Sequence, residues 1–143
     1  MNSKHVPPTL YHFTCDHGHT GITRTGTLLP NLHPFMPALG PVLWLTDFAE
    51  PPTPESVGLQ SMYVTCDRLT YRYRVQCKAV VQWRDIRQRA PKEVVADLEA
   101  FGQPEHWWVV RRPVTASEFS FDASWKRPTA VIDVNALLLR GEP

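Results

Sequence analysis

Fourteen of the 143 residues are proline, and their distribution limits the possible folds of this chain more than any other feature. They gather in residues 30–41 and 51–54. Each proline removes a backbone donor and disfavours helical geometry in the residue before it. Long helices are therefore excluded from both stretches, and short elements are expected between them.

Short strands outnumber helices between the prolines. Residues 16–26 are a predicted helix, with Asp16 as a possible N-cap and Gly26 as its terminator. A second helix is predicted at residues 92–101, because apolar residues recur there at helical spacing; they are Val94, Val95, Leu98 and Phe101. Strands are predicted at residues 10–14, 42–46, 61–66, 71–81, 106–111 and 130–134.

The order of these elements indicates the fold class. The helices are not regularly interleaved with the strands, which argues against a doubly wound parallel sheet. We expect residues 1–143 to form a single α+β domain with a mixed or largely antiparallel sheet and a few short helices. In residues 71–75, the alternation YRYRV puts aromatic side chains on one face and arginines on the other.

Composition excludes several functional classes. The formal net charge is +1, so no global field attracts nucleic acid or an anionic membrane. Apolar runs such as residues 136–139 are far shorter than the roughly 20 residues of a membrane span. Residues 1–8 are polar and lack the hydrophobic region of a signal peptide. A cytoplasmic protein without a membrane partner is expected.

Cysteine and histidine do not predict a metal site. The three cysteines are an odd number without paired spacing, which does not suit a disulfide framework. Cys15, His17 and His19 lie close together, but their spacing matches no standard zinc motif and the second half of such a site is missing. We expect no metal. The sequence also has no glycine-rich phosphate loop, so any nucleotide must be held by other means.

Three motifs follow one another near the start of the chain. They are LYHFT at residues 10–14, GTLLP at residues 26–30 after the predicted helix, and VLWLTD at residues 42–47. This series resembles the opening of the ADP-ribosyltransferase superfamily, in particular the His-Tyr-Glu branch of poly-ADP-ribose polymerases and diphtheria-like toxins. The resemblance implies that the sheet is split around a cleft that binds NAD+.

The resemblance also implies roles for individual residues. His12 would hydrogen-bond the adenosine ribose, Thr14 would steady the same turn, and backbone groups beside His12, including Phe13, would hold the nicotinamide amide. Trp44 would stack on the nicotinamide ring, and a flat aromatic ring is a suitable platform for a pyridinium. Where the family frequently carries a second ring, this chain has Glu55.

Cleavage of the nicotinamide–ribose bond calls for an acid. The reaction passes through an oxocarbenium-like state that a nearby carboxylate stabilises. Residues 103–110, QPEHWWVV, resemble the family's final motif, which implies Glu105 as the catalytic acid and Gln103 as a residue facing the acceptor. Glu118 is the alternative acid if the final strand is placed differently.

Each of these residues also has a plainer structural explanation. His12 could be a hydrogen-bonded structural histidine, Trp44 could belong only to the core, and Glu105 could be an exposed residue before a strand.

Three functions remain open at this point. The first is transfer of ADP-ribose from NAD+ to a protein or nucleic acid, or hydrolysis of NAD+. The second is an enzyme like the RNA 2′-phosphotransferases, for which arginines would bind phosphate; the candidates are Arg72, Arg74, Arg111 and Arg112, and we favour a solvated face for them. The third is an inactive module that binds a nucleotide or a protein.

Overall fold

The computed structural model describes residues 9–58 and 67–127. Within these ranges the chain has two α-helices, α1 (Asp16–Thr25) and α2 (Lys92–Glu99). The strands are β1 (Leu10–Thr14), β2 (Thr27–Leu28), β3 (Leu43–Thr46), β4 (Tyr71–Val75), β5 (Val80–Gln82), β6 (Trp107–Val110), β7 (Val114–Thr115) and β8 (Phe119–Phe121). The strands expected at 61–66 and 130–134 lie outside the described residues.

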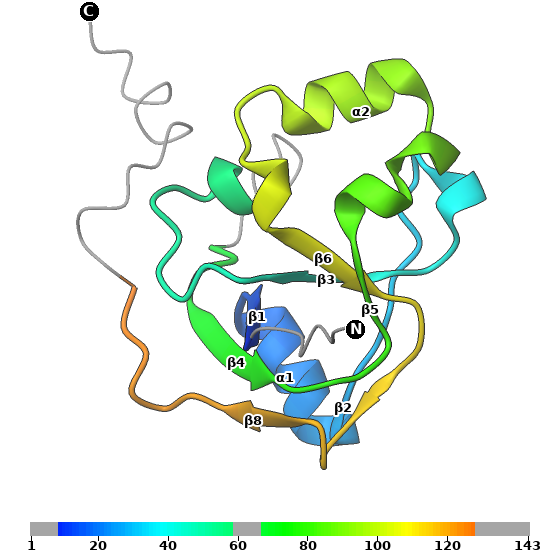
Figure 1. Ribbon diagram of the computed structural model, residues 1–143. Coiled ribbons are helices and arrows are strands. Elements are labelled where there is room, and N and C mark those ends of the chain that lie inside the picture. The colour runs from blue at the N-terminus through cyan, green and yellow to red at the C-terminus, as the bar shows by residue number, and fades with distance from the viewer. Residues whose placement is uncertain (1–8, 59–66, 128–143) are drawn as a thin grey trace, which may run out of the picture.

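Six strands form one curled sheet in the order β5-β6-β3-β1-β4-β8, and β2 pairs with β7 in a second, small sheet. All of these pairings are antiparallel. Figure 1 shows the curl of the large sheet, with α2 on one side of β3 and β6 and α1 on the other. The predicted α+β class with a largely antiparallel sheet is therefore confirmed.

The two sides of β3 belong to different cores. Leu43 and Leu45 pack in the core that contains Ile22 of α1, whereas Trp44 packs against the core that contains Val95 of α2. This division follows from the alternation of side chains along a strand. It means that β3 is covered on both faces.

The first helix agrees with its predicted end but not with its predicted cap. Gly26 has a φ of 68°, a left-handed conformation that favours glycine, and its N–H donates to the carbonyl of Ile22. Cys15 occupies the N-cap position, and Asp16 is the first helical residue. The Asp16 carboxylate instead acts on the hydroxyl of Tyr71 and raises the pKa of that tyrosine.

The predicted strand at residues 71–81 forms two strands, β4 and β5, which lie towards opposite edges of the sheet. β4 pairs with β1 through Val75, which lies opposite Leu10 at the start of β1. Beyond Val75 the chain has no further partner in β1, and β5 pairs with β6 at the other edge. The prediction of one strand is wrong because its two halves have different partners.

The second helix is shorter than predicted. α2 ends at Glu99, and Phe101 lies past its last turn with 80% of its surface exposed. Phe101 therefore does not share the apolar face that buries Val95 and partly buries Val94 and Leu98. In the described part of the chain, no helix is both long enough and apolar enough to cross a membrane.

Candidate functional site

A cleft of about 540 Å³ opens beside β1 and β3. The backbones of these two strands pair at Tyr11 and Thr46, whereas β1 pairs with β4 along its whole length. The remaining wall comes from α1, β2 and the loop after it, together with Val57 and Arg68. Of the predicted site residues, His12, Phe13, Thr14 and Trp44 line this cleft.

His12 connects the two strands through its side chain. Its Nδ1 lies 3.0 Å from the carbonyl oxygen of Trp44. Because a carbonyl only accepts, Nδ1 carries the proton, and the neutral ring leaves Nε2 as a hydrogen-bond acceptor. Burial lowers the pKa of His12 below 6.5, the bond to Trp44 opposes this, and the charge of Arg68 lowers the pKa further. The imidazole is therefore neutral at neutral pH.

Thr14 is buried at the contact between β1 and α1. A Cβ added to Gly18 would lie 1.8 Å from Oγ1 of Thr14. Only glycine at this position of α1 lets the helix approach the end of the strand so closely. The local sequence thus places the Thr14 hydroxyl beneath the first turn of α1.

Trp44 takes part in both the cleft and the second core. Its ring lies 5.0 Å from the ring of Trp83 and 6.2 Å from that of Trp107, measured between centroids. Its carbonyl, not its ring, makes the contact with His12. Phe13, the neighbour of His12, is buried against Val57 and Leu69.

The predicted acid and its neighbour lie apart from these residues. Glu105 is exposed in the 3₁₀ turn Pro104–His106, directly before β6, and neither it nor Gln103 lines the cleft. This turn is tied to Ser56, whose carbonyl accepts from the backbone N–H of Gln103 at 3.1 Å and from Nε1 of Trp107 at 2.7 Å. The expected convergence of Glu105 with His12, Thr14 and Trp44 is not observed.

The alternative acid, Glu118, is held by an arginine. Its two carboxylate oxygens accept from Arg112 at 2.9 and 2.7 Å. These bonds, with help from the Thr115 N–H, lower the pKa of Glu118 to about 2. Glu118 does not line the cleft either.

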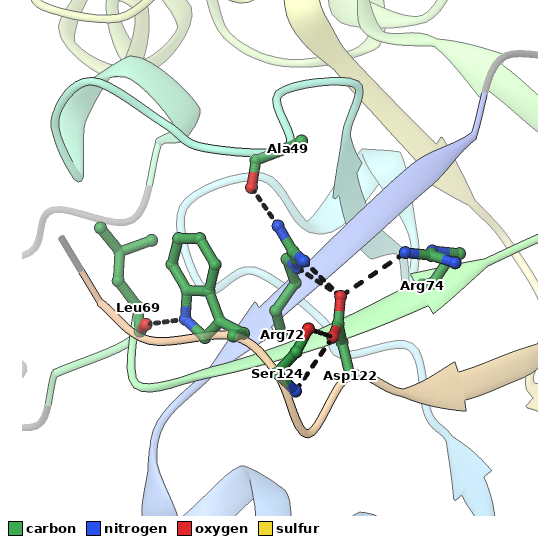
Figure 2. Close-up of polar contacts among 7 residues, drawn as sticks. Ala49, Leu69, Arg72, Arg74, Asp122 and Ser124 are labelled. Carbon is green, nitrogen blue, oxygen red and sulfur yellow. Dashed lines mark hydrogen bonds and ion pairs between the residues drawn. The ribbon is translucent and has the colours of Figure 1, made fainter.

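The side chain of Arg72 makes its contacts with other parts of the fold, as Figure 2 shows. Its guanidinium bonds the carboxylate of Asp122 and the carbonyl of Ala49, and it stacks on the rings of Tyr11 and Trp125. Only 12% of its side chain is exposed, so the expected solvated face is wrong for Arg72. Arg74 is 51% exposed and 3.7 Å from the same carboxylate.

Neither of the later arginines lines the cleft. Arg112 bonds Glu118, and Arg111 is exposed and donates to the carbonyl of Leu39 at 3.4 Å. The four arginines considered for phosphate binding therefore all lie outside the lining of this cleft.

One arginine that the sequence did not single out does line the cleft. Arg68 lies close enough to His12 and His33 for its charge to lower the pKa of both. Within residues 9–58 and 67–127 its guanidinium has no hydrogen bond or ion pair. No sequence motif identifies Arg68, because its position beside the cleft depends on packing between segments that are far apart in the chain.

A second set of residues that the sequence did not single out lies where β3 and β6 meet. Nδ1 of His106 is 2.5 Å from Oδ1 of Asp47, and Nε1 of Trp108 donates to Oδ2 of Asp47 at 3.2 Å. The ring of Phe48 stacks on His106 at 4.0 Å. The motif VLWLTD contains Asp47, but nothing in the sequence links it to His106.

The histidines of α1 do not gather into a metal site in the described residues, where no group of three His, Cys, Asp or Glu side chains is placed to hold an ion. His19 stacks on Tyr71 at 4.0 Å and bonds the hydroxyl of Tyr73 at 2.5 Å.

Comparisons with protein-family models, curated proteins and solved structures returned no match. The function of the chain must therefore be argued from its own motifs and geometry.

Proposed function

We propose that the cleft binds NAD+ and that the protein cleaves the nicotinamide–ribose bond, with ADP-ribose passing to a macromolecular acceptor or to water. The observation that carries this proposal is the convergence of His12, Phe13, Thr14 and Trp44 on one cleft. The strands that carry LYHFT, VLWLTD and QPEHWWVV, which are β1, β3 and β6, are also neighbours in the large sheet. This arrangement suits the ADP-ribosyltransferase-like fold that the motifs imply.

The charge of the cleft suits a dinucleotide. Arg68 is the only residue with a full charge among those that line it, within the described part of the chain. A guanidinium that bonds no side chain or carbonyl in residues 9–58 and 67–127 is well suited to the pyrophosphate of NAD+. Nε2 of His12 accepts a hydrogen bond from a ribose hydroxyl in this arrangement, as its neutral form requires.

The nicotinamide end of NAD+ is assigned to the region of Trp44. The ring of Trp44 is half-buried and held by two buried tryptophans, so it is a rigid platform. Rigid aromatic platforms bind a flat cationic ring at a small cost in conformational entropy. Thr14 supports the turn on which the backbone of Phe13 would hold the carboxamide.

Glu105 remains the proposed acid. Its turn precedes β6, which pairs with β3 next to Trp44, and the turn is bonded to Ser56, the neighbour of the cleft residue Val57. An exposed side chain on such a turn can approach the ribose when NAD+ is bound, and catalytic contacts often tighten only in the complex. Gln103, two residues earlier, would face the acceptor.

The decisive experiment is incubation of the purified protein with NAD+ and measurement of nicotinamide release. We expect release by the native protein and by His17→Gln, an exposed histidine of α1, but at least tenfold less by His12→Ala. An unchanged rate in His12→Ala would overturn the role of the cleft.

The same preparation separates the other functions. Removal of a 2′-phosphate from RNA without nicotinamide release would select the phosphotransferase, which Arg68 and His33 in the cleft would serve. Binding of NAD+ without either reaction would select the inactive binding module.

A further inference from the structure

Asp47 and His106 form a pair that the strand register fixes. Thr46 lies opposite Trp107 in the β3–β6 ladder, so Asp47 and His106 are the next residues across from each other. The Asp47 N–H also donates to the carbonyl of His106 at 3.3 Å. With Trp108 on the second oxygen of Asp47 and Phe48 against the ring of His106, both side chains have defined positions.

This geometry orients the proton of the imidazole. At 2.5 Å from the carboxylate, Nδ1 of His106 donates to Oδ1 of Asp47. In the neutral ring, Nε2 then carries a lone pair that can accept a proton. The side chain of His106 is 34% exposed. Within residues 9–58 and 67–127 no protein group bonds this nitrogen. A base oriented by a carboxylate and open to solvent is the part of a catalytic triad that takes a proton.

The pair is next to the cleft. Asp47 directly follows Thr46, which lines the cleft, and the ring of Phe48 packs against the cluster of Phe13 and Val57, which also line it. His106 directly follows Glu105, the proposed acid. An acceptor that approaches the ribose from this end would meet both residues.

We propose that the Asp47–His106 pair is the general base that activates the acceptor or water, an inference that rests on the proposed cleavage of NAD+. Nε2 of His106 takes a proton from the acceptor. At the same time, the oxygen or nitrogen of the acceptor forms a bond to C1 of the nicotinamide ribose. The bond from that carbon to the nicotinamide nitrogen breaks, and its electron pair neutralises the pyridinium ring. Asp47 stabilises the imidazolium that results.

The first test compares the NAD+ dissociation constant with the turnover rate. His106→Gln should leave the dissociation constant within about twofold and lower the rate of nicotinamide release on the order of a hundredfold or more, as removal of a general base does. His17→Gln is the matched control. In Asp47→Asn, Trp108 fixes the single amide oxygen, so the amide NH2 faces Nδ1 and moves the ring proton to Nε2. A similar loss is expected.

The second test separates a base from a structural tie between β3 and β6. In His106→Ala, added imidazole should restore at least a tenth of the lost rate, whereas pyrazole, a similar ring but a much weaker base, should not. Thermal unfolding of each variant reports the structural contribution separately.

The outcomes are distinguishable. Native protein that leaves NAD+ intact overturns the proposed function and this inference with it. Native protein that cleaves NAD+, with an unchanged rate in His106→Gln, overturns only the inference. Loss of rate that imidazole and pyrazole restore equally, or that neither restores, assigns the pair to structure and also overturns it.

Discussion

At the scale of single residues, the partly buried imidazole of His12 links stability to pH. Its pKa is lowered below 6.5 in the folded protein, so the unfolded chain binds the proton more readily. The contribution of His12 to the free energy of unfolding is therefore complete above pH 6.5, and it is lost as the pH falls from that value towards the pKa of the folded state. His33 acts in the same direction, since burial and Arg68 lower its pKa as well.

We expect the free energy of unfolding in urea to be smaller at about pH 5.5 than at about pH 7.5. His12→Gln, whose amide can still donate to the carbonyl of Trp44, should reduce this difference. Glu118 and Asp122 do not disturb the comparison, because their lowered pKa values move their loss of stability to more acidic pH. An equal pH dependence in both proteins would contradict the assignment to His12.

A second prediction at this scale concerns Glu105. In the proposed reaction its charge acts only as the glycosidic bond breaks, so Glu105→Gln should spare NAD+ binding and slow nicotinamide release on the order of a hundredfold or more. Glu93→Gln, also exposed but on α2, is the control. Full turnover in an active Glu105→Gln protein would transfer the role to Glu118 or to an arginine.

At the scale of elements, the close contact between α1 and β1 depends on the absence of a side chain at Gly18. Gly18→Ala should destabilise the protein by about 1 to 3 kcal/mol, because its Cβ would overlap the Thr14 hydroxyl. The matched control is Gly21→Ala in the same helix, where a Cβ meets no atom within 4 Å. That substitution should be neutral or stabilising, by up to about 1 kcal/mol.

Chemical denaturation of both variants measures the difference directly. Addition of Thr14→Ala to Gly18→Ala should recover part of the loss, since the three nearest atoms to the new Cβ all belong to Thr14. Equal stability of Gly18→Ala and Gly21→Ala would show that the helix can shift without cost.

The elements that sequence patterns predicted are those with local signals. β1, α1, β3 and β6 carry a cap glycine or a run of bulky residues, and each forms within a residue or two of its predicted range. The division of residues 71–81 into β4 and β5 depends on pairing with β1 and β6, which no local pattern encodes. The exposure of Phe101 likewise depends on where the α2 helix stops.

The candidate site divides in the same way. His12, Thr14 and Trp44 were found because their motifs are continuous in sequence, and they share a cleft. Arg68 and the Asp47–His106 pair were missed, because each joins segments that are far apart in the chain. Glu105 does not line the cleft, and the position of its turn depends on the bonds to Ser56, another long-range contact.

At the scale of the whole molecule, Arg72 joins its own strand, β4, to three other segments. Its contacts reach Tyr11 on β1, the carbonyl of Ala49, and Asp122 and Trp125 after β8. Asp122→Ala leaves this guanidinium without its carboxylate at a largely buried site and should cost about 3 kcal/mol of stability. Arg74→Ala, on the same strand but half exposed, should cost less than about 0.5 kcal/mol.

Urea unfolding of the two variants provides the test. Arg72→Lys keeps the charge but loses the planar fork that serves both acceptors and both rings, so it should also be destabilised. A stable Asp122→Ala protein would mean that Ala49 and the aromatic rings suffice to hold the arginine.

The bond between His12 and the carbonyl of Trp44 has a consequence for the kinetics of binding. The side chain of His12 bonds this carbonyl on the side of β1, and the cleft beside β1 and β3 is open in the protein alone. A ligand of the proposed kind would enter this cleft by displacing water, without separating the two strands. We therefore expect its association to need no slow conformational step beforehand.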